Sequence, residues 1–278
     1  MKKLLILTLL SAFASSVLAQ DFSGKIPPKT ISISAPQNSL KIDENLEYSM
    51  EWIGIPVGKI FLRIGSAKIN DKDCYRLTVD AFSSSFLSAF YDVRYTVNSF
   101  MDKASLLPVR FEKYRKVKGK VAREEIDFDH KRGEVKYKEE GDAPRIVISP
   151  DRAAMEGKIP ATYKILPDSQ DLLSSFYFLR LSDLRPGETF KININYGLRN
   201  WVMDVKIGEP YMKSIRRRGT FEVFDAIISS ELNKFILGDA VLKICFTADS
   251  RRIPIEFKLG TGLGAFRGVI KQAPDANE

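Results

Sequence analysis

Residues 44–69 read ENLEYSMEWIGIPVGKIFLRIGSAKI, and this stretch decides the fold class of the chain. Tyr48, Met50 and Trp52 alternate with polar residues, and alternation resumes at Ile60 after a centre that contains Gly and Pro. Successive side chains of a strand point to opposite faces, so a period of two predicts half-buried strands. We therefore interpret the stretch as one long β-hairpin.

The same alternation recurs along the chain in about a dozen segments, with turn residues between them. One segment differs: residues 171–181 are apolar on nearly every side, which is typical of a buried helix, and Asp168 or Ser169 is expected to cap it. The chain shows no regular alternation of strands and helices. We predict an all-β fold, a large antiparallel β-barrel-like domain with one covering α-helix.

The first residues have the features of a secretory signal peptide. Lys2 and Lys3 precede a short apolar run, and Val17-Leu18-Ala19 supplies small residues before the cut. The run is short for a membrane span, and no Cys follows the cut, so we expect a soluble protein of the periplasm. The predicted divisions are a signal peptide (1–19), an extended lead-in (20–43), a single β-barrel-like domain (44–271) and a tail (272–278).

The chain carries a net charge of +8, and its basic residues gather in two places. Residues 113–123 form a basic run, and Arg216, Arg217 and Arg218 form a second group. We interpret the run as an ordinary solvated strand face. The alternative is a contact with anionic lipid head groups, lipopolysaccharide or acidic glycans, including peripheral contact with a membrane. Export excludes nucleic acid as a partner.

No stretch of the chain carries a catalytic motif. His130 is the single histidine and lies in a charged turn, DFDHKRG, where a surface position is expected. There is no Gly-x-Ser-x-Gly elbow. Cys74 and Cys245 lie among apolar strand residues, so buried free thiols are favoured over a disulfide, which stays open. Two Cys and one His do not make a common zinc site, and no cofactor is expected.

Two further patterns resemble sites but have simpler explanations. Asp127 and Asp129 share a strand face, but Ile126 and Phe128 occupy the opposite face, so the two carboxylates should face solvent. The glycines of GTGLGAFRG, residues 260–268, lack a following helix that could hold phosphate. We assign them to bulges or to closure of the sheet.

Several blocks of the chain resemble a known family. They run in the same order over about residues 40–270, and they are ENLEYSMEWIGIPVG, YDVRYTVNSFMDKASLLPVRF, QDLLSSFYFLR, PGETFKI and SRRIPIEFKLGTGLGAFRGVI. The chain is similar here to the exported bacterial domain-of-unknown-function 3108 family. This resemblance implies a mainly antiparallel, β-barrel-like domain in the cell envelope. It implies no active site, so no residue roles follow from it.

The leading hypothesis is a non-enzymatic periplasmic protein that binds or escorts a lipid-like, glycolipid or polysaccharide ligand, or assists envelope assembly proteins. The segment FSSSFLSAFY, residues 82–91, interrupts the strand pattern and is expected to form an apolar helix or flap. Its aromatic residues and Trp52 are the candidate ligand-binding residues: Trp52, Phe86, Phe90 and Tyr91.

Two alternatives to this hypothesis stay open. One is a periplasmic hydrolase of envelope glycan or lipid whose carboxylates come from distant parts of the sequence. The other is a membrane-embedded β-barrel, which the buried-type helix and the polar C-terminal residues APDANE disfavour.

Overall fold

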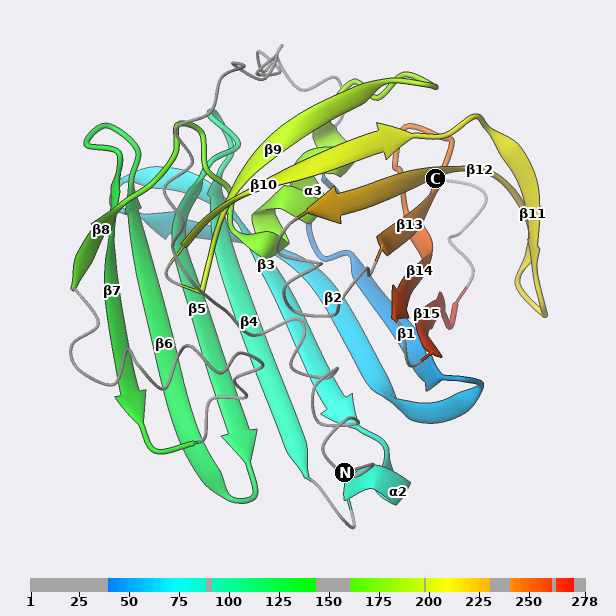
Figure 1. Ribbon diagram of the computed structural model, residues 1–278, viewed down its shortest axis with the longest axis horizontal. Helices are drawn as coiled ribbons and strands as arrows, with labels where there is room; N and C mark the ends of the chain where they lie inside the picture. Colours follow the sequence, from blue (N-terminus) through cyan, green and yellow to red (C-terminus); the bar gives the residue numbers. More distant parts are fainter. Residues whose placement is uncertain are drawn as a thin grey trace.

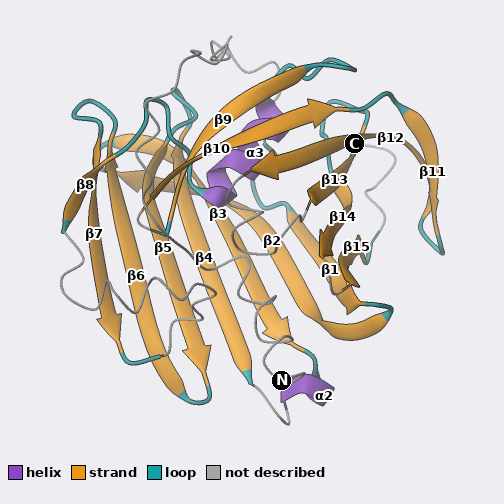
Figure 2. Cartoon of the chain, viewed as in Figure 1, coloured by secondary structure: helices purple, strands orange, loops and turns teal. Residues whose placement is uncertain are grey.

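The computed structural model describes residues 40–88, 92–143, 161–197, 199–230, 241–261 and 264–272, in which fifteen strands form one sheet (Figures 1 and 2). The first eight strands are β1 (Asn45–Trp52), β2 (Ile55–Ile69), β3 (Lys72–Ser83), β4 (Val93–Asp102), β5 (Pro108–Val117), β6 (Lys120–Asp129), β7 (Glu134–Gly141) and β8 (Thr162–Lys164). The others are β9 (Thr189–Tyr196), β10 (Arg199–Ile207), β11 (Tyr211–Ile215), β12 (Gly219–Ser230), β13 (Val241–Thr247), β14 (Pro254–Thr261) and β15 (Gly264–Ile270). The all-β prediction is confirmed.

The hairpin predicted from residues 44–69 is present as β1 and β2. Tyr48 pairs with Ile60, and both side chains are buried on the inner face of the sheet. Ile53 and Gly54 connect the strands with φ angles of +49° and +77°. Positive φ at both central residues is the geometry of a tight hairpin turn, which explains the glycine at this position.

The sheet consists of two arms, which are β1 to β8 (the first arm) and β9 to β15 (the second arm). Its order is β8-β7-β6-β5-β4-β3-β2-β1-β15-β14-β13-β12-β10-β9, with β11 paired to β12 on the side. Nearly all neighbours in this order are also consecutive in sequence, and the pairing of β1 with β15 joins the two arms. The sheet curves around an interior (Figure 1). The fold is therefore barrel-like, with β8 and β9 as its two edges.

The two edges meet through the segment that leads from β8 into the helix. The backbone N–H of Gln170 donates to Asn193 O at 2.8 Å, and the N–H of Asn195 donates to Gln170 O at 2.7 Å. The Tyr163 hydroxyl donates to Asn195 Oδ1 at 2.9 Å. Asn193 and Asn200 also donate from their side chains to Pro167 O and Lys164 O, at 2.8 and 3.0 Å. A short parallel bridge and a few side-chain bonds thus join the edges in place of a full ladder.

Helix α3 (Leu172–Leu181) lies inside the curve of the sheet (Figure 2). Leu173, Tyr177 and Leu181 are buried in a core cluster that includes residues of both arms, so the helix fills one part of the interior. Its N-cap is Asp171, and the expectation of Asp168 or Ser169 at this position is wrong. The carboxylate of Asp171 is buried beside the first turn and accepts from the backbone N–H groups of Leu173 and Ser174.

Both cysteines are free and buried. Cys74 lies on β3 and Cys245 on β13, and four strands of the sheet separate these two. At about 4.8 Å per strand, about 24 Å of sheet lies between the two residues. The expectation of buried free thiols is therefore confirmed.

The segment at 82–91 is only partly the expected flap. Phe82 and Ser83 extend β3, and α2 (Ser85–Ser88) is a single helical turn beside the start of β2. Residues 89–91 lie outside the described residues, as do the predicted signal peptide and most of the lead-in, residues 1–39. Neither described helix has the length and apolar character needed to cross a membrane.

Candidate functional site

A charged cluster lies on the inner face of the first arm. Every second residue of β5 is buried, from Val109 through Phe111, Lys113 and Arg115 to Val117. The side chain of Lys113 is 5% exposed and that of Arg115 only 4%. The prediction that the run 113–123 is a solvated face is therefore wrong for these two residues. The strand alternation places them with apolar residues on the inner face, because a side chain's face depends on its position in the strand and not on its charge.

Strand register gives both cations their partners. Lys113 pairs across to Glu124 on β6, and Glu124 pairs across to Glu139 on β7. Lys113 Nζ lies 3.0 Å from Glu124 Oε2, and Arg115 Nη2 lies 2.6 Å from Glu139 Oε1. Arg115 Nη1 is 3.9 Å from Glu124, so the guanidinium bridges both carboxylates. The result is a four-membered ion cluster with balanced charge inside the barrel wall.

Further contacts fix the orientation of this cluster. The Tyr137 hydroxyl donates to Glu139 Oε2 at 2.8 Å, and Arg115 Nη2 donates to Ala143 O at 3.1 Å. Arg115 Nε is buried and has no hydrogen-bond partner in the part of the chain that the structure describes. A buried N–H without a partner costs about 1–3 kcal/mol. This donor is suited to a ligand oxygen.

A pocket of about 590 Å³ adjoins the cluster. Gly141 contributes to its wall with a φ of +104°, and a Cβ at this position would lie 2.2 Å from Val121 O. Only glycine fits this position, because any side chain would collide with the backbone of β6. The lining residues are Arg115, Tyr137, Lys138, Glu139, Gly141, Asp142, Ala143 and Ala161.

The inner face changes character from one arm to the other. One row across the paired strands runs Ile270, Tyr48, Ile60, Ala81, Tyr95, Arg115, Ala122 and Gly141. Five of its residues precede Arg115, and the hydroxyls of Tyr48 and Tyr95 are the only side-chain polar groups among them. The neighbouring row runs Leu62, Val79, Val97, Lys113, Glu124 and Glu139. The first row carries one charge, Arg115, and ends in Ala122 and Gly141, whereas the second row is apolar from β2 to β4 and charged from Lys113 to Glu139. The charged end of the second row and Arg115 lie side by side, which is an arrangement that suits an amphiphilic ligand.

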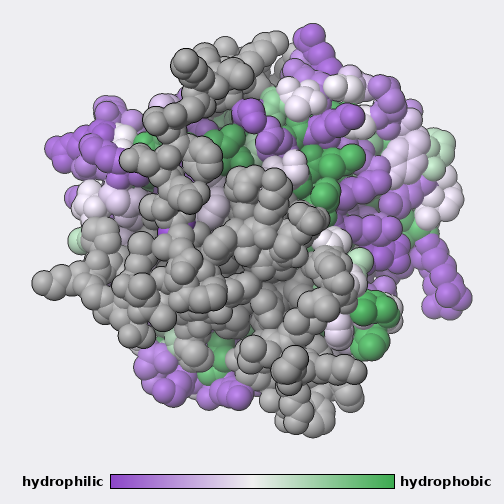
Figure 3. Space-filling model, in the orientation of Figure 1, coloured by the Kyte–Doolittle hydropathy of each residue, from purple (hydrophilic) through white to green (hydrophobic). Residues whose placement is uncertain are grey.

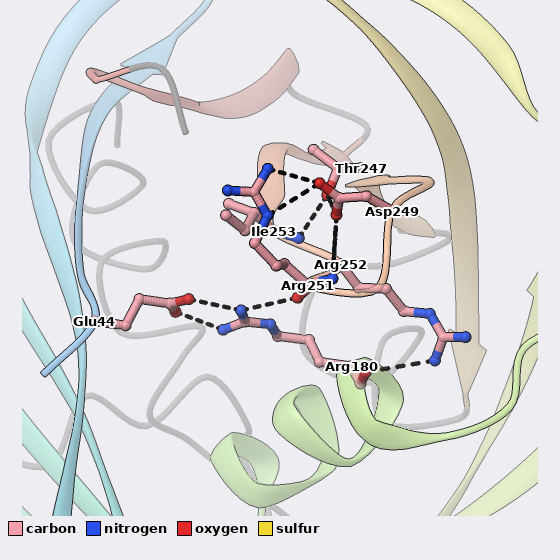
Figure 4. Close-up of polar contacts among 7 residues, drawn as sticks. All are labelled: Glu44, Arg180, Thr247, Asp249, Arg251, Arg252 and Ile253. Atoms are coloured by element: carbon pink, nitrogen blue, oxygen red, sulfur yellow. Dashed lines mark hydrogen bonds and ion pairs between the residues drawn. The ribbon is translucent and has the colours of Figure 1, made fainter. Parts of the chain in front are cut away.

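A second polar network holds α3 in place (Figure 4). The Arg180 guanidinium donates to both carboxylate oxygens of Glu44, at 2.6 and 2.8 Å, and to Arg251 O at 3.1 Å. Asp249 accepts from the guanidinium of Arg251, while Arg252 donates to the carbonyls of Arg180 and Ser182 at the end of the helix. Arg180 is only 2% exposed and its terminal nitrogens bind Glu44 and Arg251, so this network fastens the helix, while its Nε has no hydrogen-bond partner in the described part of the chain.

The structure does not gather the predicted ligand-binding residues into one described site. Trp52 ends β1 on the inner face, half-buried, with its ring 6.0 Å from that of Phe266. Phe86 belongs to α2, but its side chain lies outside the described part, as do Phe90 and Tyr91 altogether. The charged cluster on β5 to β7 is a different site, about four to six strands away from Trp52 along the sheet.

Two residues that we assigned to exposed or inert positions have defined surroundings. His130 lies in the expected turn but is half-buried, and its Nε2 lies 2.9 Å from Pro108 O. Burial raises the pKa of the Cys245 thiol to about 11, and the Tyr211 hydroxyl lies 3.7 Å from its sulfur. A thiol held neutral in this way is a poor nucleophile.

The comparisons with known proteins agree with this architecture. No curated protein matches the chain. A crystal structure of a β-barrel-like protein of the domain of unknown function DUF1849, from Brucella abortus, is similar with a TM-score of 0.53. The match covers 82% of this chain and 95% of that one at 11% identity, so the likeness concerns the fold alone. The model of the family DUF3108, described as a protein of unknown function, matches residues 47–271. With most of the barrel inside that match, the chain belongs to the DUF3108 family.

Proposed function

We propose that this protein is a non-enzymatic periplasmic binder of an amphiphilic envelope ligand, a lipid or glycolipid with a polar head group. The observation that carries the proposal is the buried ion cluster of Lys113, Arg115, Glu124 and Glu139 beside a pocket. Buried ion pairs are often no more stable than apolar residues of similar volume. A charged group in a mainly apolar interior is thus better explained by recognition of a polar group than by stability.

The ligand has a defined orientation in this proposal. Its head group binds at Arg115, Tyr137 and Glu139, where guanidinium, hydroxyl and carboxylate converge. Its apolar part extends along the inner face toward Tyr95 and Ile60, which are packed in a core cluster and have to move aside to admit it. Arg115 and Ile60 are three strands apart, about 14 Å, which is comparable to a medium-length acyl chain.

The outer face of the barrel carries charged residues, which supports a protein that is surrounded by water. Outward positions on β1, β2 and β14 carry charged residues, among them Glu47, Lys59, Arg63, Glu256 and Lys258. A strand that faces lipid needs apolar residues at these positions. The signal-peptide pattern of residues 1–19 supports the periplasm as the compartment.

The decisive experiment compares inner and outer arginines of β5. We expect Arg115→Met with Glu139→Gln, which removes both charges together, to weaken binding of a fluorescent lysophospholipid about tenfold or more. The matched control is Arg110→Met, because Arg110 lies on the outward face of the same strand and pairs with Asp127 at 2.7 Å. Equal binding by both variants and the unchanged protein contradicts the proposal, as does an absence of binding in all three.

A hydrolase is the second candidate, favoured by one observation. Glu124 and Glu139 are direct cross-strand neighbours on the inner face, and Glu139 lines the pocket. Two neighbouring carboxylates are the groups that glycoside hydrolysis uses. Each is neutralised here by a cation, which suits binding better than acid catalysis. Turnover of an envelope glycan or lipid that Glu124→Gln and Glu139→Gln both abolish would favour this candidate.

A further inference from the structure

The turn between β1 and β2 exposes apolar side chains at one end of the barrel. Ile53 is 62% exposed and Ile55 is 53% exposed, although isoleucine is usually buried in proteins. The turn is well anchored, because the Ile53 N–H donates to Ala265 O at 3.2 Å and the ring of Trp52 stacks on Phe266. Figure 3 shows an apolar patch where Figure 1 places this turn. These isoleucines are thus held outward on a rigid support.

The strands behind this turn carry excess positive charge on their outer face. Glu256, only 3% exposed, has three cations within 4 Å: Lys213 at 3.2 Å, Lys258 at 3.4 Å and Arg267 at 2.8 Å. One carboxylate neutralises one of these charges. Lys258 and Arg267 remain 51% and 43% exposed, so solvent or a ligand reaches their charged ends.

The same imbalance recurs farther along the hairpin. Glu47 is shared by Lys59 at 3.2 Å and Lys271 at 3.0 Å. With Glu51, which lies opposite Arg267, these two described groups together comprise three carboxylates and five cations. The surface is complementary to a partner with a dense negative charge.

The apolar and cationic groups lie at different distances from the tip of the hairpin, which is the turn at Ile53 and Gly54. Arg267 pairs with Glu51, two residues behind Ile53, and Lys258 lies beside it on β14. At about 3.4 Å per residue these cations are about 7 Å behind the tip. A side chain that enters the interfacial region of a bilayer lies about 5–10 Å deep. The cations would then be level with the phosphate groups.

We propose that the β1–β2 turn docks this protein onto an anionic lipid bilayer, with Ile53 and Ile55 inserted and Arg267 and Lys258 bound to head-group phosphates. A protein partner is a weaker fit, since a stable protein interface buries about 1,200–2,000 Å² and two projecting isoleucines offer far less. The proposal concerns the outside of the barrel and does not depend on a ligand inside it.

Vesicle flotation tests this proposal with the mature chain, residues 20–278. Phosphatidylcholine vesicles with and without phosphatidylglycerol are compared at low and high salt. We expect binding only to the vesicles with phosphatidylglycerol, and weaker binding at high salt because the cations are screened. Ile53→Ser with Ile55→Ser should reduce that binding roughly tenfold or more. Lys258→Gln should reduce it about fivefold.

Two control variants separate this effect from general changes of the surface. Ile227→Ser removes an isoleucine that is 37% exposed on β12, and Lys191→Gln removes a lysine that is 44% exposed on β9. Both should float like the unchanged protein. Equal flotation of the double isoleucine variant and the unchanged protein would overturn the proposal. So would failure of the unchanged protein to bind either vesicle, which would make a protein partner the better occupant. Loss of the Arg115 site leaves this assay unaffected, so the two proposals fail separately.

Discussion

His130 packs its ring against Phe128, with the ring centroids 5.7 Å apart and the planes inclined by 12°. Its Nε2 faces the carbonyl of Pro108, which can only accept, so Nε2 carries the proton and Nδ1 is the nitrogen that titrates. Nδ1 is buried without a partner in the described part of the chain. Burial lowers the pKa of His130 below its ordinary 6.5, because the charged form loses its hydration.

The single histidine makes this lowered pKa directly measurable. We expect the imidazole Cε1–H resonance to titrate below pH 6.5 in the folded protein. The unfolded chain then binds a proton more readily than the folded one, so the free energy of unfolding should fall as pH drops below about 6.5. His130→Gln should show a smaller decline over the same range. A folded-state pKa above 6.5 would contradict the burial that the structure shows.

The same residue-level contacts explain the glycine-rich stretch near the C-terminus. A Cβ on Gly268 would lie 2.1 Å from the ring of Phe257 on the neighbouring strand, so glycine leaves room for that ring. We expected bulges or closure of the sheet at these glycines, and the role of Gly268 is instead to make room for a neighbouring side chain. Residues 262–263 of the stretch lie outside the described residues.

At the scale of elements, α3 depends on one buried cation. Arg180 projects from the helix to Glu44, just before β1, and to the turn between β13 and β14 (Figure 4). It thereby connects the helix to both arms of the sheet. Removal of one partner from a buried pair leaves an uncompensated charge, which costs about 3–5 kcal/mol.

We therefore expect Arg180→Met to lower the free energy of unfolding by about 3–5 kcal/mol in urea titration. Arg180→Met with Glu44→Gln should recover part of this loss, because no charge then stays buried alone. Lys191→Met is the control, since Lys191 pairs with Asp204 on the surface and such pairs contribute about 1 kcal/mol or less. A loss no larger than that of the control would mean that packing alone holds the helix.

Strand alternation in the sequence predicted the elements well but misplaced their charges. The hairpin at 44–69 and the helix at 171–181 are both confirmed, because each depends on the local periodicity of apolar residues. Lys113 and Arg115 share their face with Phe111, and that parity was visible in the sequence. Their acidic partners Glu124 and Glu139 become apparent only with strand register, which the sequence leaves open. The site was thus missed because a charged residue was taken to be an exposed one.

At the scale of the molecule, the two arms of the sheet are joined at two places, and the two junctions differ in their hydrogen bonding. β1 and β15 join through a regular antiparallel ladder, whereas β8 and β9 meet through the segment around Gln170. The closure uses polar groups of residues 163–171, including the Tyr163 hydroxyl and the Gln170 backbone. Polar contacts of this kind have no periodicity in the sequence. The sequence therefore predicted a barrel-like sheet but not the junction between β8 and β9, which we call the seam.

The seam is the place where the barrel should open most easily. Local opening is favoured where few hydrogen bonds and few buried contacts join two elements. We expect the amides of Gln170 and Asn195 to exchange with deuterium faster than those in the β2–β3 ladder, where twelve residue pairs hold the strands together. Tyr163→Phe should speed exchange at the seam further, because it removes the side-chain bond to Asn195, and should leave β2 and β3 unchanged. Exchange resolved by residue with NMR would check both statements. If the seam exchanges as slowly as the β2–β3 ladder, the barrel opens elsewhere, and a ligand bound at Arg115 needs another route to the interior.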